Sequence, residues 1–146
     1  MMLITETESG YYGRLSGKLG VTRIRSDRDL VSLTQKGVPA TAIHALVRGG
    51  LSDAEVYGLI VPRRTLTHRI ANGQPLSKEE SDKAIRVARI IAYAEVVFGE
   101  TERAWRWLRK AKRQFEGSSP IEMLATETGA RLVEELIAQI DDGIAA

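Results

Sequence analysis

The sequence contains no cysteine, and aromatic residues make up only 5% of it. Disulfide bridges and thiolate chemistry are therefore excluded, and we expect a cytoplasmic protein. Histidine occurs only at His44 and His68, without carboxylates at the spacing of metal ligands, so we expect no metal site. The N-terminus lacks the basic and then apolar pattern of a signal peptide. The most apolar run, IIAYAEVVFG, is short and interrupted by Glu95, so we expect no membrane span.

Groups that could form a catalytic centre are also lacking. No set of nucleophile, base and acid stands out along the chain. The segment SGKLG (residues 16–20) contains glycine and lysine, but it lacks the spacing and the following Ser or Thr of a phosphate-binding loop. We therefore expect a protein that is not an enzyme and that carries no cofactor.

Charge is distributed very unevenly along the chain. Residues 60–115 contain 13 Lys or Arg against 6 Asp or Glu, whereas residues 116–146 contain 1 against 7. A basic middle and an acidic end indicate two different partners or two faces of one fold. The alternative is a long solvated helix surface followed by an acidic last helix, which is what composition alone favours.

The pattern predicts an all-α protein of about seven short helices, because helix-start signals recur and no stretch alternates like a strand. Ser52 with Glu55 and Ser77 with Glu80 have the spacing of capping boxes. A basic helix is expected over residues 101–115. We expect an irregular N-terminal arm over residues 1–25, a helix-turn-helix unit over 26–75 and a helical C-terminal domain over 76–146.

The segment VPRRTLTHRI (residues 61–70) has the layout of the second helix of a helix-turn-helix, with residues 51–60 as the first. Val61, Leu66 and Ile70 would anchor this helix to the core. A small residue commonly opens the turn, but Ile60 stands there and Gly58 comes two residues earlier. The candidate DNA-binding residues are Arg63, Arg64, Thr65, Thr67, His68 and Arg69. The alternative is a packing helix with a solvated charged face, and the surrounding Lys/Arg surplus favours DNA.

A series of short motifs follows residue 60. The chain supplies Thr65-Leu66, Leu76-Ser77 with Glu80-Ser81, Ala94 before Val97-Phe98-Gly99, Ala104 with Trp107-Leu108, Pro120 with Glu122 and Leu124, and Thr126-Glu127 with Gly129-Ala130. In this order the motifs resemble those of the Xre/MbcA/ParS family of antitoxins, over roughly residues 38–146. Two positions depart from the family pattern: His68 replaces a basic residue, and the segment RKAKRQFEG after Trp107-Leu108 is more basic than usual.

The resemblance implies an all-helical antitoxin, with an N-terminal helix-turn-helix part and a C-terminal toxin-binding part. Such proteins commonly form homodimers and repress their own operon. Their usual partners are RES-domain toxins, which resemble ADP-ribosyltransferases and consume NAD. The alternative is a solitary helix-turn-helix regulator without a toxin partner.

The acidic end IDDGIAA suggests how a toxin could be blocked. A pocket that binds NAD must accept a pyrophosphate, so carboxylates on a reachable chain end could occupy its cationic sites. Two Asp residues at a helix C-terminus are unfavourable with the helix dipole, which favours a local function over a merely solvated end. The candidate toxin-binding residues are Glu135, Gln139, Asp141, Asp142, Gly143 and Ala146.

Overall fold

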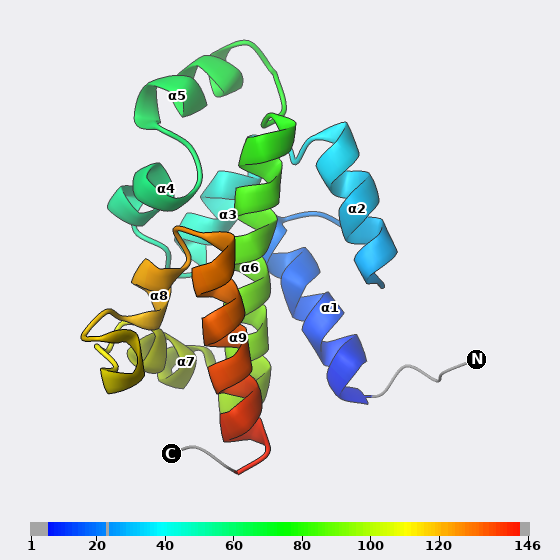
Figure 1. Cartoon of the computed structure of the whole chain (residues 1–146). Helices are drawn as coiled ribbons and strands as arrows, with labels where there is room; N and C mark the ends of the chain where they lie inside the picture. The colour runs from blue at the N-terminus through cyan, green and yellow to red at the C-terminus, as the bar shows by residue number, and fades with distance from the viewer. Residues whose placement is uncertain (1–5, 23, 144–146) are drawn as a thin grey trace. The chain divides into compact units, whose positions relative to one another are not determined.

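The computed structural model describes residues 6–22 and 24–143, and every regular element in this part of the chain is a helix (Figure 1). The expected all-α class is confirmed. No helix among these residues is long and apolar enough to cross a membrane. The elements are α1 (Glu6–Leu19), α2 (Asp27–Lys36), α3 (Ala42–Arg48), α4 (Asp53–Leu59), α5 (Arg63–Ala71), α6 (Lys78–Phe98), α7 (Thr101–Leu108), the 3₁₀ turn η1 (Arg113–Phe115), α8 (Pro120–Met123) and α9 (Glu127–Asp141).

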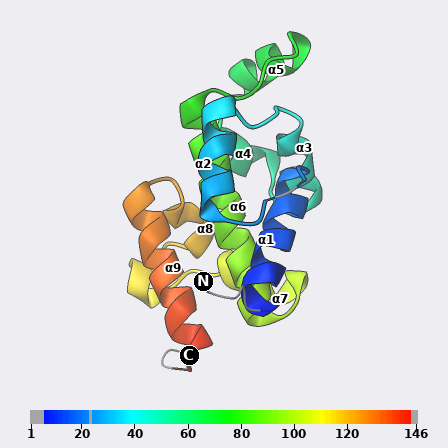
Figure 2. The same ribbon diagram turned by 90° about the vertical axis from the view of Figure 1, so that its right-hand side faces the viewer.

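The helix α1 corrects the expectation of an irregular arm over residues 1–25. Leu15 and Leu19, one helical turn apart, are fully buried, and α1 packs against α3 (Figure 2). Gly10, Gly13 and Gly17 lie within α1 and lower its intrinsic helix propensity, which is why the sequence looks irregular. Tertiary burial of the two leucines outweighs that propensity. Residues 1–5, the rest of the predicted arm before α1, lie outside the described residues.

The chain forms two compact units, Met1–Ala88 and Arg89–Ala146, and α6 contributes residues to both. The sequence placed the boundary after residue 75, whereas the two compact units divide between Ala88 and Arg89, within α6. The first half of α6 belongs to the N-terminal unit because its buried Ser81 is hydrogen-bonded to the backbone of Val38. Ala84 and Ile85 on the same half of α6 are also buried.

The N-terminal unit comprises α1 to α5 and the start of α6. The side chains of Ser26 and Ser52 accept hydrogen bonds from the N–H groups of Asp29 and Glu55, which fixes where α2 and α4 begin. In both ribbon views α5 lies at the opposite end of this unit from α1 (Figures 1 and 2). The buried apolar residues of the N-terminal unit include Leu30, Val38, Ile43, Leu46, Leu51, Val56, Ile60, Val61, Leu66 and Leu76.

The C-terminal unit comprises the second half of α6, α7, η1, α8 and α9. The basic helix expected over residues 101–115 is shorter, because α7 ends at Leu108. The chain then forms a compact turn in which the N–H of Lys112 donates to the carbonyl of Ser118, and this turn buries Phe115. Fully buried residues of this unit include Ile91, Leu108, Leu124, Val133 and Ile137.

Candidate functional site

The helices α4 and α5 are joined by the short turn Ile60–Pro62, which gives the expected helix-turn-helix layout. The N–H groups of Ile60 and Val61 both donate to the carbonyl of Val56, at 2.9 and 3.1 Å. Ile60 has a φ of −122°, so the turn needs no glycine. A Cβ added at Gly58 would meet open space, so Gly58 has no steric role in the turn either. The large residue at the turn is accommodated by burial of its side chain.

The exposed face of α5 carries most of the expected DNA-binding side chains. Arg63, Arg64, Thr67 and His68 are exposed, Thr65 is half-buried, and Leu66 points into the core. The Thr67 hydroxyl donates to the carbonyl of Arg63, one helical turn earlier, at 2.9 Å. Ile70, expected to be a core anchor, is 41% exposed. This expectation was wrong: Val61 and Leu66 supply the apolar anchors of α5.

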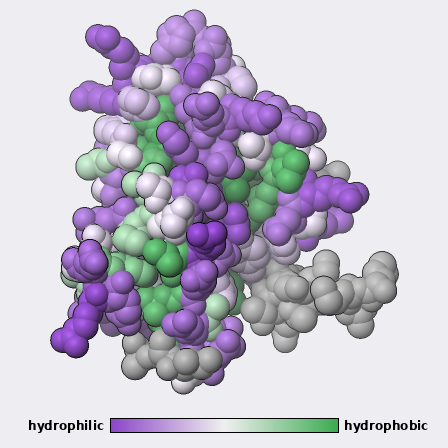
Figure 3. All heavy atoms as spheres, viewed as in Figure 1, coloured by the Kyte–Doolittle hydropathy of each residue, from purple (hydrophilic) through white to green (hydrophobic). Residues whose placement is uncertain are grey.

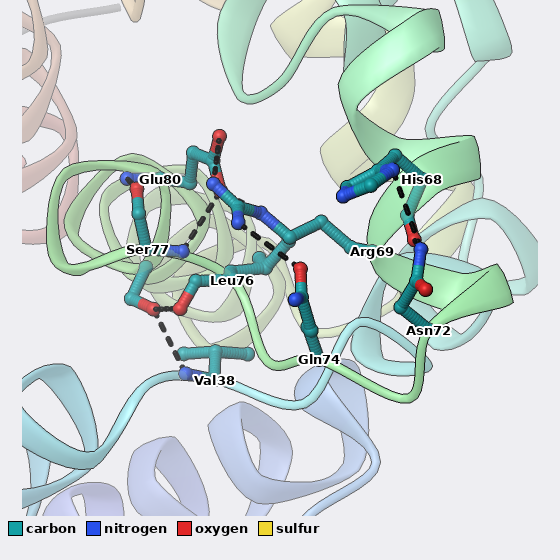
Figure 4. A network of polar contacts seen from close by, with 9 residues as sticks. Val38, His68, Arg69, Asn72, Gln74, Leu76, Ser77 and Glu80 are labelled. Atoms are coloured by element: carbon teal, nitrogen blue, oxygen red, sulfur yellow. Dashed lines mark hydrogen bonds and ion pairs between the residues drawn. The ribbon is translucent and has the colours of Figure 1, made fainter.

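Arg69 differs from the other candidate DNA-binding residues because its guanidinium is held within the N-terminal unit. Its Nε lies 3.1 Å from Oε1 of Glu80 at the start of α6, and its Nη1 donates to Gln74 at 3.5 Å (Figure 4). The side chains of Arg69 and Glu80 are 26% and 14% exposed. Arg69 therefore fastens α5 to α6 instead of extending from the exposed face.

Glu80 also caps α6. Its Oε1 accepts from the N–H of Ser77 at 2.8 Å, and the N–H of Glu80 donates back to the Ser77 hydroxyl at 3.1 Å. Burial acts to raise the pKa of Glu80, but the hydrogen bond from Ser77 and the hydrogen bonds and charge of Arg69 outweigh it. The pKa of this carboxyl consequently lies below its ordinary value, and Glu80 stays ionised at neutral pH.

A second set of contacts ties the segment before α6 to the loop after α2. The Ser81 hydroxyl accepts from the N–H of Val38 at 2.8 Å and donates to the carbonyl of Leu76 at 3.4 Å. The N–H of Leu76 donates to the carbonyl of Val38 at 2.8 Å. Gly37 has a φ of 91°, and a Cβ there would lie 2.7 Å from the carbonyl oxygen of Leu76, so only glycine fits this approach.

The expected toxin-binding residues lie on the last turns of α9. Glu135, Gln139, Asp141 and Asp142 are exposed, and Gly143 has a φ of 76°. Ala146 lies outside the described residues. Burial raises the pKa of the Tyr93 hydroxyl on α6, and the negative charges of α9, with Asp141 first, raise it further. The end of α9 therefore carries an exposed cluster of negative charge beside Tyr93.

The C-terminal unit also contains a groove that sequence reasoning did not identify, lined by residues of α7, the following turn and α9. The Trp107 ring lies 5.3 Å from that of Phe98, and the Lys112 ammonium lies 4.9 Å from the Trp107 ring centre. Arg103, Arg106, Lys110 and Arg113 line the groove with Leu136 and Ile140. Trp105 is buried, whereas Trp107 is half-buried. The surplus of Lys and Arg over residues 60–115 was the one feature of the sequence that indicated a charged surface here. We call this groove the Trp107 groove; Phe98, Arg103, Arg106, Trp107, Lys110, Lys112, Arg113, Leu136 and Ile140 line it.

Comparisons with known proteins match both units. Residues 29–89 match the antitoxin Xre-like helix-turn-helix domain, and residues 94–143 match the antitoxin Xre/MbcA/ParS C-terminal toxin-binding domain. An antitoxin Xre of Pseudomonas putida (strain KT2440) is 40% identical over 133 residues, which cover 91% of this chain and 84% of that protein. The chain belongs to the Xre/MbcA/ParS family of antitoxins. It is therefore an antitoxin of a toxin–antitoxin system with a helix-turn-helix domain.

Two further relatives agree with this assignment. The Prs ADP-ribosylating antitoxin of Sphingobium sp. (strain YBL2) is 30% identical over 126 residues, covering 79% of each chain. An antitoxin Xre of Yersinia enterocolitica is 32% identical over 85 residues, covering 58% of this antitoxin and 57% of the relative. The toxin-binding domain implies a toxin partner, and the helix-turn-helix domain indicates DNA binding.

The motifs that carried the resemblance have structural roles in this antitoxin. Ser77, Glu80 and Ser81 form the contacts that hold α5 and Val38 to the start of α6. The Thr126 hydroxyl accepts from the N–H of Gly129 at 2.9 Å and caps α9. A Cβ at Gly129 would collide with the backbone carbonyl of Met123, so the glycine lets α8 approach α9. These motif residues shape the two units, and the exposed charged residues are left to contact partners.

Proposed function

We propose that this antitoxin binds and neutralises a RES-domain toxin that consumes NAD, with its C-terminal segment blocking the toxin active site, and that it represses its own operon in the cytoplasm. The observation that carries the proposal is the separation of two exposed charged ends on two units. The start of α5 is basic, and the end of α9 is acidic. The name of the Sphingobium relative adds support, because it connects an antitoxin to ADP-ribosylation, and RES-domain toxins resemble ADP-ribosyltransferases.

The DNA-binding part of the proposal rests on α5. Its first residues, Arg63 and Arg64, are exposed and directly follow the Pro62 cap. Arginines at the start of a recognition helix can contact phosphates or the O6 and N7 atoms of guanine in the major groove. A homodimer would present two copies of α5 to half-sites one helical turn of DNA apart.

The toxin-blocking part rests on the carboxylates at the end of α9. Asp141 and Asp142 are exposed, and Gly143, which follows them, adopts a positive φ, a conformation that glycine favours. A pocket that binds the pyrophosphate of NAD presents cationic groups, and carboxylates can pair with these groups. Glu135 and Gln139, one turn apart on α9, would contact the rim of the same pocket.

The test is co-expression of this antitoxin with the product of the adjacent gene, with growth and cellular NAD measured together. The proposal expects that the neighbour alone arrests growth and depletes NAD, and that the antitoxin restores both. An electrophoretic mobility assay with DNA from upstream of the operon tests repression in parallel. A harmless neighbour, or toxicity that the antitoxin does not change, would contradict the toxin part. Specific DNA binding in that case would support a solitary regulator.

A further inference from the structure

The Trp107 groove combines exposed cations with an apolar floor. Arg106, Lys110 and Arg113 are exposed, and within residues 24–143 these three side chains form no ion pair. Arg103 forms an ion pair with Glu100 at 3.7 Å, and both side chains are at least 60% exposed, so that pair contributes little. Among the described residues of the unit, the positive charge of Arg106, Lys110 and Arg113 is therefore not neutralised by a carboxylate.

We propose that the Trp107 groove docks an acidic segment of the toxin that carries an apolar side chain. This inference rests on the proposed function and adds a second contact surface to it. The groove lies entirely within residues 94–143, which match the toxin-binding domain. Charge complementarity identifies an acidic occupant, because four exposed cations and the half-buried Lys112 line the groove together with the rings of Phe98 and Trp107.

The floor of the groove favours a protein segment over a phosphate backbone. Phe98, Trp107, Leu136 and Ile140 line it. In the space-filling view, apolar surface of the C-terminal unit lies between the α7–α8 segment and α9, beside hydrophilic side chains (Figure 3). Bases of a nucleic acid also stack on aromatic rings such as Trp107, so the distinguishing residues are the aliphatic Leu136 and Ile140, which an apolar protein side chain would cover. Tryptophan and arginine are also the residue types that most often dominate protein–protein binding energy.

Lys112 provides a further reason for an anionic occupant. Burial lowers the pKa of its ammonium, and the charge of Lys110 lowers it further. The ammonium lies over the Trp107 ring, where the ring quadrupole attracts it. A carboxylate in the groove would offset both the burial and the repulsion, so docking would stabilise the charged lysine.

The groove and the acidic end of α9 share one helix. Leu136 and Ile140 line the groove, while Glu135 and Gln139 occupy neighbouring positions on α9. One toxin can therefore contact both surfaces at once. Its acidic segment would meet the groove and its cationic pocket would meet Asp141 and Asp142. Opposite charges on the two surfaces would fix the orientation of the complex and exclude the reverse orientation.

The test compares two triple variants of the full-length antitoxin. R106S/K110S/R113S removes three groove cations, and R28S/K36S/K83S removes three exposed cations of the N-terminal unit. Their affinities for the purified toxin are measured by titration calorimetry at low and high salt, and thermal unfolding checks that both fold. We expect the groove variant to raise Kd about tenfold or more and to flatten the salt dependence, whereas the control changes Kd less than about twofold.

The apolar floor has its own variants, W107A and the conservative W107F. We expect W107A to weaken toxin binding more than W107F does, with the thermal unfolding of both variants recorded. Equal toxin affinity for the unaltered antitoxin and the groove variant overturns the docking surface and leaves the proposed function intact. A groove variant that loses affinity only for labelled DNA or RNA also overturns it. If the unaltered antitoxin does not bind the toxin, both the docking surface and the proposed function are overturned.

Discussion

The Nε atom of Arg69 lies 3.1 Å from Oε1 of Glu80, and this contact joins the candidate DNA-contact helix α5 to the start of α6. The same carboxylate oxygen accepts from the N–H of Ser77. One ionised group therefore caps α6 and holds the guanidinium that orients α5. Because both side chains are mostly buried, solvent screens this pair less than it screens an exposed one.

The stability of the N-terminal unit should depend on the ionisation of Glu80. Its folded-state pKa lies below the ordinary value of 4.5, so its contribution is fully present above that value and is lost as the pH falls through the folded-state pKa. We expect Glu80→Gln to lower the free energy of unfolding at pH 7 by about 1–2 kcal/mol, because the charge-assisted bonds are removed. Urea unfolding between pH 7 and pH 3 measures this.

The matched control is the neighbouring exposed Glu79→Gln, which we expect to change stability by less than about 0.5 kcal/mol. The difference between the unaltered protein and Glu80→Gln should shrink below pH 4.5, as the native carboxyl becomes protonated. A difference that stays constant down to pH 3 would contradict the assigned role of the Glu80 charge.

Ser81→Ala should destabilise the N-terminal unit without changing its surface. The serine is fully buried, and its removal leaves the N–H of Val38 without the acceptor that lies 2.8 Å away. An unsatisfied buried donor costs roughly 1–3 kcal/mol, whereas Ser32→Ala at an exposed position of α2 should be nearly neutral. Thermal unfolding of both variants measures the contrast. Equal melting temperatures would show that the Ser81 hydroxyl is not needed to hold Val38.

Local signals in the sequence placed the helix starts well. Ser52 with Glu55 and Ser77 with Glu80 form the predicted capping contacts at the starts of α4 and α6, because capping depends on residues only three positions apart. Contacts distant in sequence were not predictable in this way. The burial of Leu15 and Leu19 depends on packing against α3, which no local pattern of the glycine-containing segment encodes.

The candidate site shows the same division. Exposure of Arg63 and Arg64 follows from their position at the start of a helix whose Leu66 is buried. The orientation of Arg69 depends on Glu80, eleven residues later and on another helix, so the sequence left it among the DNA-binding candidates. The Trp107 groove likewise needs α9 to supply part of its floor. Composition indicated its charge but could not indicate its shape.

Gly129 and Gly58 form a pair of glycines with opposite expected responses to alanine. A Cβ at Gly129 would collide with the Met123 carbonyl, whereas a Cβ at Gly58, within α4, would meet nothing. We expect Gly129→Ala to destabilise the C-terminal unit by roughly 2 kcal/mol or more through backbone displacement. Gly58→Ala should stabilise the protein by about 0.4–1 kcal/mol through reduced unfolded-state entropy. Chemical unfolding measures both, and a neutral Gly129→Ala would contradict the close approach of α8 and α9.

DNA binding should depend on the first residues of α5. If Arg63 and Arg64 read bases, we expect R63A/R64A to weaken operator binding by about 1–3 kcal/mol per arginine; if they contact phosphates, binding should weaken uniformly across sequences. In the phosphate case, the slope of log K against log salt concentration should become shallower by about 2, because about two fewer counterions are released. Because both side chains are exposed, the fold should be unaffected. Fluorescence anisotropy with operator and scrambled duplexes, at several salt concentrations, measures these effects.

The matched control for α5 is R28A/K36A, which removes two exposed cations from α2. We expect this control variant to keep most of the affinity of the unaltered antitoxin for the operator. If R63A/R64A and R28A/K36A bind the operator equally well, α5 is not the DNA-contact helix, and the contact must be sought elsewhere on the N-terminal unit.

Removal of the acidic end should separate toxin inhibition from toxin binding. A truncation of residues 141–146 deletes Asp141 and Asp142 but leaves the Trp107 groove residues in place. If the carboxylates occupy the cationic sites for the NAD pyrophosphate, the truncated antitoxin should still bind the toxin through the groove while NAD consumption resumes. D141N/D142N keeps the chain length and removes only the charge, so it should reproduce part of the loss. Operator binding should be unchanged for both, because α5 lies in the other compact unit. Full inhibition of NAD consumption by the truncated antitoxin would show that the chain end does not block the active site, and that binding at other surfaces is sufficient.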